Sequence, residues 1–95
     1  MKKVEHYKDM LMDEVEDAKM YAEYYIAYKN TSPQWAKMFA SMARDELQHA
    51  NYIETISQEA VSKMAWVPEE DQEKWERCLK KKAETTALVE LMLSK

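Results

Sequence analysis

One short segment, Asp45-Glu46-Leu47-Gln48-His49, contains a carboxylate and an imidazole at a spacing that lets them act together. Glu46 and His49 form the only Glu-x-x-His pair in the sequence. Residues three apart on a helix lie on the same face, so both side chains can reach one point in space. Burying an unpaired ion costs several kcal/mol, and a divalent metal is one partner that would satisfy both groups.

Both residues interrupt a stripe that is otherwise apolar, and a third ionisable residue, Glu14, interrupts a matching stripe earlier in the chain. Such stripes, with steps of three and four residues, are typical of helices that bury one face. We therefore expect Glu14, Glu46 and His49 to point toward a core. The two stripes are Val4, Tyr7, Leu11, Glu14, Ala18, Tyr21, Tyr25 and Tyr28, and then Trp35, Phe39, Met42, Glu46, His49, Ile53, Ile56 and Ala60.

The elements that must position these residues are three long helices. Glycine is absent and proline occurs only twice, which favours an all-α chain. We expect helices over about residues 3–29, 33–64 and 68–93, in one domain spanning residues 1–95. Asn30 can end the first helix in a left-handed conformation, Ser32 is a suitable N-cap, and Pro33 suits the first position of the second helix.

The short connection predicts that the first two helices fold back on each other as a long antiparallel hairpin. Glu14 precedes the centre of this connection by about as many residues as Glu46 and His49 follow it. With a rise of 1.5 Å per residue, all three lie roughly 22–26 Å from the turn. We therefore expect the three side chains to meet at one level. The third helix has no comparable group, and we expect it to serve packing and association.

The composition excludes several classes of function. The net charge of −4, with both signs interspersed, provides no basic stripe for nucleic acid. A single cysteine, Cys78, excludes an intramolecular disulfide and a cysteine-based metal cluster within one chain, and we expect it to be a small buried residue. The N-terminus lacks an apolar signal region and no apolar run reaches 18 residues, so we expect a cytoplasmic protein without a membrane segment.

Two segments of the chain resemble the ferritin-like/rubrerythrin-like superfamily. Residues 12–25 are similar to that family's first helix, in which a metal-binding glutamate is followed seven residues later by a tyrosine, here Glu14 and Tyr21. Residues 43–50 are similar to its second-helix signature, Glu-x-x-His-Ala. The resemblance extends over roughly residues 4–60, and the two motifs at this separation are more specific together than either is alone.

The resemblance implies a di-iron carboxylate site. In ferritin-like bundles two helices each provide a glutamate and two others each provide Glu-x-x-His. Family members carry these ligands on two helical pairs, whereas this chain has one pair. The resemblance therefore implies a half-site that a second copy completes, as in encapsulated-ferritin-like proteins, so that a homodimer, or an assembly of dimers, forms a ferritin-like four-helix bundle. Two iron ions per dimer are expected, with manganese or zinc as alternatives.

The resemblance also implies roles for individual residues. Glu46 would bridge two metal ions, Glu14 would cap one, and His49 would bind through one ring nitrogen. Asp45 is a candidate to orient His49 of the opposing chain, since ligating histidines usually have such an acceptor. Tyr21 could hydrogen-bond a ligand or act as a nearby redox-active group. The implied activity is oxidation of Fe(II) with oxygen or peroxide, that is, ferroxidase or peroxide-consuming oxidoreductase chemistry, although the rubredoxin-type Cys-x-x-Cys module of a full rubrerythrin is missing.

Two other functions remain compatible with the residues. The chain could be a helical association module without catalysis, in which Glu46 and His49 form a buried polar contact that fixes helix register. It could also be a mononuclear metal-binding protein without turnover, because three ligands from one chain can hold a single ion with open positions.

Overall fold

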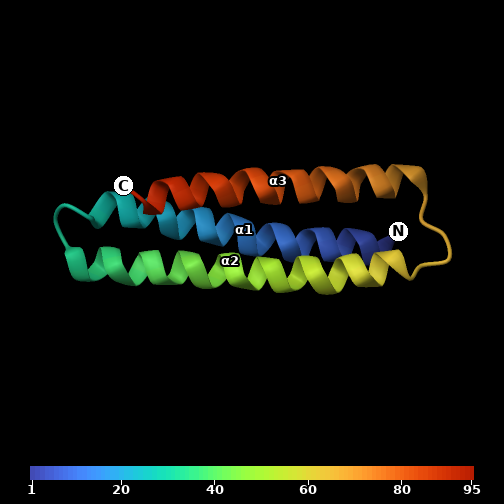
Figure 1. Cartoon of the computed structure of the whole chain (residues 1–95), viewed down its shortest axis with the longest axis horizontal. Coiled ribbons are helices and arrows are strands. Elements are labelled where there is room, and N and C mark those ends of the chain that lie inside the picture. Colours follow the sequence, from blue (N-terminus) through green and yellow to red (C-terminus); the bar gives the residue numbers. More distant parts are fainter.

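The computed structural model describes all residues, 1–95, and is entirely helical. Three helices, α1 (Lys2–Tyr28), α2 (Pro33–Ser62) and α3 (Glu69–Leu93), form an elongated bundle measuring 53 × 17 × 17 Å, in which α2 runs antiparallel to α1 and α3 runs parallel to α1 (Figure 1). The all-α class predicted from the sequence is confirmed. The second helix stops at Ser62, before the expected end at residue 64. No helix carries an apolar stretch that could span a bilayer.

The connection between α1 and α2 is a tight turn without left-handed residues. The carbonyl of Tyr28 accepts hydrogen bonds from the backbone N–H groups of Thr31 and Ser32. No residue has a positive φ, so the left-handed conformation considered for Asn30 is not adopted. Ser32 is the N-cap residue of α2, as predicted, although its side chain makes no capping hydrogen bond, and Pro33 is the first helical residue.

α1 is the central helix, because it packs on both α2 and α3, while α2 and α3 contact each other much less. In Figure 1 it lies between its two neighbours along the whole length of the bundle. The core consists of two clusters along α1, with the free thiol of Cys78 buried in the first as expected. The first comprises Val4, Leu11, Val15, Ala50, Trp75 and Cys78, and the second comprises Ala18, Ala22, Ala43, Leu47 and Val89.

Besides the two core clusters, long polar side chains connect α2 to α3. Lys82 on α3 forms an ion pair with Glu54 (3.1 Å between Nζ and Oε1) and donates a hydrogen bond to Asn51. The indole N–H of Trp75 donates to the side-chain oxygen of Gln58. These bonds fix the position of α3 relative to α2, and they identify the face of α2 that carries Asn51, Glu54 and Gln58 as the one nearest α3.

The apolar stripe of α2 from Trp35 to Ala60, which we call the α2 stripe, is not the buried face of a single chain. None of its eight residues is buried, and Trp35 and Ile56 are 56% and 67% exposed. The expectation that this stripe faces the core of the chain is therefore wrong. The buried seam is displaced by about one residue and consists mainly of small side chains, namely Ala36, Ala40, Ala43, Leu47, Ala50 and Ser57.

We predict that the α1 core determines the stability of the bundle. Leu11 is fully buried among residues from all three helices, so Leu11→Ala should lower the free energy of unfolding by about 3 kcal/mol through lost burial and a cavity. Leu91→Ala removes the same atoms from a side chain that is 56% exposed and should cost less than about 0.5 kcal/mol. Urea unfolding followed by circular dichroism measures both values. Equal effects of the two substitutions would contradict this account of the core.

Candidate metal centre

The hairpin brings Glu14, Glu46 and His49 together, as their equal distances from the turn predicted. Nδ1 of His49 lies 3.7 Å from Oε2 of Glu14 and 3.8 Å from Oε2 of Glu46. One ligand atom from each residue lies within 4.8 Å of the other two. Glu14 stands near the middle of α1, and Glu46 and His49 occupy one face near the middle of α2. Three donors therefore converge on a volume that a single ion could occupy.

The three side chains lie at the outer edge of the groove between α1 and α2, not inside the chain. Their side chains are 20% exposed for Glu46, 27% for Glu14 and 55% for His49. The carboxylates thus form a partly sheltered floor, and the imidazole stands above it in solvent. Because the donors occupy only one side of the site, the opposite side is free to accept ligands from elsewhere.

The two carboxyl groups are close enough to compete for ionisation. A side-chain hydrogen bond with Glu14, together with partial burial and the negative charge of Glu14, raises the pKa of Glu46 to about 7, while His49 opposes the shift. At neutral pH the pair therefore retains a shared proton for much of the time. A divalent cation would replace this proton and remove the repulsion between the carboxylates, so the charge of the site suits a metal ion.

The remaining predicted residues surround this group without contacting it. Tyr21 is half-buried, and its ring stacks on Phe39 with 6.3 Å between centroids and a 20° angle between planes. Its hydroxyl makes no hydrogen bond within the chain. Asp45 is exposed and forms no ion pair with His49 of its own chain.

Sequence reasoning missed that Phe39 is the centre of an aromatic cluster. Its ring lies within 5.0–6.3 Å, between centroids, of the rings of Tyr21, Tyr24, Tyr28 and Trp35. The signal for this cluster was the tyrosine-rich end of the first stripe opposite the start of the second. It occupies the end of the hairpin next to the α1–α2 turn.

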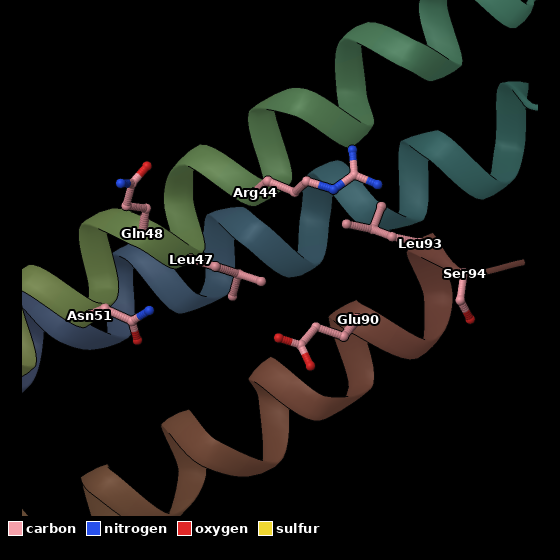
Figure 2. Close-up of a pocket in the computed structure, with 7 residues that line it drawn as sticks. All are labelled: Arg44, Leu47, Gln48, Asn51, Glu90, Leu93 and Ser94. Atoms are coloured by element: carbon pink, nitrogen blue, oxygen red, sulfur yellow. The ribbon is translucent and has the colours of Figure 1, made fainter.

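A separate groove of about 410 Å³ lies between α2 and the end of α3 (Figure 2). Arg44 on α2 and Glu90 on α3 stand on its opposite walls. It lies on the α3 side of α2, away from the three converging donors. With one carboxylate and no imidazole or thiol, it offers no comparable set of metal ligands. Its seven lining residues are Arg44, Leu47, Gln48, Asn51, Glu90, Leu93 and Ser94.

The fold and the donor group define a class: a helical protein with an antiparallel hairpin that carries a glutamate on one helix and Glu-x-x-His at the same level on the next. The family model described as Rubrerythrin matches residues 9–92, a stretch that includes all three donors. The chain therefore belongs to the rubrerythrin family, and the resemblance drawn from its two motifs is confirmed. Neither the curated proteins nor the solved structures provided a match.

We predict that the crowded carboxylates destabilise the metal-free chain as pH rises. The folded-state pKa of Glu46, about 7, exceeds its ordinary value of 4.5. The folded state therefore binds more protons between these values, and the associated stability is lost as pH rises through 7. Glu46→Gln keeps the shape and removes the charge, so it should stabilise the metal-free chain by about 1 kcal/mol at pH 8, less than the full shift implies because the site is partly solvated.

Urea unfolding in the presence of a chelator, at pH 5.5 and pH 8, provides this measurement. Glu16→Gln, at an exposed position on α1, is the matched control and should change neither value appreciably. If the wild-type chain and Glu46→Gln lost stability equally between the two pH values, the carboxylate pair would not be the source of the effect.

Proposed function

We propose that the chain is one half of a di-iron carboxylate protein, and that two copies assemble around a shared metal centre at a homodimer interface. The observation that supports this proposal is the convergence of Glu14, Glu46 and His49 on the side of the hairpin that α3 leaves uncovered. Two copies would supply four carboxylates and two imidazoles, which is the ligand set of ferritin-like di-iron proteins. Membership of the rubrerythrin family supports the same metal.

The exposure and protonation of the three donors support a separate metal-binding role for each. Glu46 is the less exposed carboxylate and shares a proton with Glu14, so we assign it the bridging position and Glu14 a terminal one. Loss of the shared proton on metal binding leaves both as carboxylates. His49 would bind through one ring nitrogen, and its other nitrogen would need an acceptor. Asp45, exposed one residue before Glu46, is the candidate acceptor for the His49 of a second copy.

A bound di-iron centre would allow Fe(II) to be oxidised to Fe(III) while oxygen or peroxide is reduced, and the substrates we propose are Fe(II) with either oxidant. The residues of the chain would hold the ions, limit access of water and manage protons. In the metal-free site Glu46, whose pKa lies near 7, would hold a proton that it releases when the ions bind. Tyr21, half-buried on the same stripe as Glu14, is our candidate for a redox-active side chain.

We predict that the metal depends on His49 and not on the other histidine. After anaerobic addition of Fe(II) and desalting, elemental analysis should give about one iron per chain, the ratio of a di-iron dimer. His49→Ala should reduce bound iron at least about tenfold, since loss of even an outer-shell partner costs that much. His6→Ala, at an exposed position near the N-terminus, should bind like the wild type.

The same proteins should be mixed with air or peroxide while the absorbance of Fe(III) is followed. Wild type and His6→Ala should oxidise Fe(II) faster than the buffer does, and His49→Ala should not. Absence of stoichiometric iron in the wild type would leave the non-catalytic association module as the surviving function. Iron bound without oxygen-dependent oxidation would favour the mononuclear binding protein.

A further inference from the structure

The α2 stripe is symmetric about a point midway between Leu47 and Gln48. Its steps alternate four, three, four, three, four, three and four residues, so reversing the helix direction reproduces the same spacing. An antiparallel copy of α2, centred on this point, therefore places one stripe residue opposite another at every layer. The four layers pair Trp35 with Ala60, Phe39 with Ile56, Met42 with Ile53, and Glu46 with His49.

The side chains in these layers are complementary in size and chemistry. The largest residue of the stripe, Trp35, falls opposite the smallest, Ala60, and the intermediate residues fall opposite one another. The ionisable residues meet only in the central layer, where Glu46 of one helix faces His49 of the other. Facing helices pack 8–10 Å apart, and alternating large and small residues across the contact fills this space evenly.

A parallel arrangement would not have this property. It would put Trp35 against Trp35 and Phe39 against Phe39, at the end that already carries Tyr24 and Tyr28. Ala60 would face Ala60 at the other end. One end of such a dimer would be overfilled and the other would contain a gap, and both defects are destabilising.

The α2 stripe is also free to receive a partner. None of its residues is buried in the chain, and Trp35, His49 and Ile56 are exposed. The face of α2 nearest α3 is a different one. It carries Asn51 and Glu54, which Lys82 of α3 contacts. A partner that binds this stripe should itself present an apolar surface. It should also carry the metal ligands that this chain lacks.

We propose that this occupant is a second copy of the chain in inverted orientation, with α2 packed antiparallel on α2 of the partner subunit in the register that pairs Trp35 with Ala60. This inference rests on the proposed dimeric function and adds its geometry. The interface is isologous, because each contact occurs twice by symmetry. It brings Glu46 and His49 of each subunit to the other at the centre of the bundle.

An exchange of the two outermost residues tests the register. Trp35→Ala should weaken the dimer on the order of 100-fold, because a large buried side chain is lost from both ends. Ala60→Trp should weaken it by overfilling the same layer. The double variant should recover most of the wild-type affinity. The two positions lie about 37 Å apart along one helix, so such a rescue cannot arise within a chain.

Sedimentation equilibrium, performed anaerobically with equimolar Fe(II), gives the dissociation constants, and circular dichroism confirms that each variant folds. The expected result is two weakened single variants and a rescued double variant. A dimer whose double variant is weaker than either single variant would overturn the register while the dimer itself stood. A wild-type chain that stays monomeric would overturn both the register and the proposed dimer.

A distance measurement tests the orientation without altering the stripe. Gln34 is exposed beside Trp35, and in a Cys78→Ala background Gln34→Cys accepts a single spin label. The inverted dimer places the two labels about 40 Å apart along the helix axis, whereas a parallel dimer places them within about 20 Å. Pulsed electron–electron resonance distinguishes the two values, and the shorter one would overturn the inverted orientation.

Discussion

The close approach of α1 to α2 is the contact on which the rest of the structure depends. Alanines form much of this seam, with Ala18 and Ala22 on α1 packing with Ala43 in one fully buried cluster. Small side chains let two helix backbones come near each other, and the carboxylates at the edge of the seam come near each other as a consequence. Hydrogen bonding between Glu14 and Glu46, and the raised pKa of Glu46, follow from this geometry.

The position of α3 determines which side of the hairpin is available. α3 packs on α1, and polar bridges from Lys82 and Trp75 hold it against one face of α2. The opposite edge of the α1–α2 groove remains open, and it carries both the α2 stripe and the three donors. The exposed side chains of His49 and Ile56 show that α3 does not cover this edge.

The hairpin and the meeting of its three ionisable residues could be predicted from the sequence, because helix length and the position of a turn fix the level of every residue. The direction in which these three side chains point could not be predicted. Periodicity identifies a stripe but not the neighbour that covers it, and the buried seam proved to be the adjacent row of small residues. Ala40 and Ala43 gave a weaker signal than Trp35 and Phe39, although the alanines are buried and the aromatic residues are not.

The backbone conformation of the turn between α1 and α2 could not be predicted from the residue pattern either. Asn30 is compatible with a left-handed helix end, but compatibility does not require it, and hydrogen bonds to the carbonyl of Tyr28 close the turn with no residue at positive φ. The raised pKa of Glu46 could not be read from the sequence either. It depends on the angle at which two side chains leave neighbouring helices, which no spacing rule specifies.

In the dimer that we propose, a half-site at an open face would couple metal binding to association. If two copies share the ions, any ion held by the dimer and not by the monomer stabilises the dimer, and association strengthens binding by the same factor. The repulsion between Glu14 and Glu46 favours metal binding in each copy, because it penalises the metal-free state at neutral pH. The α2 stripe would contribute the apolar area that the donors alone lack. Its central polar layer would then disfavour registers in which Glu46 met an apolar residue, so the same groups that bind the metal would also specify how the two chains align.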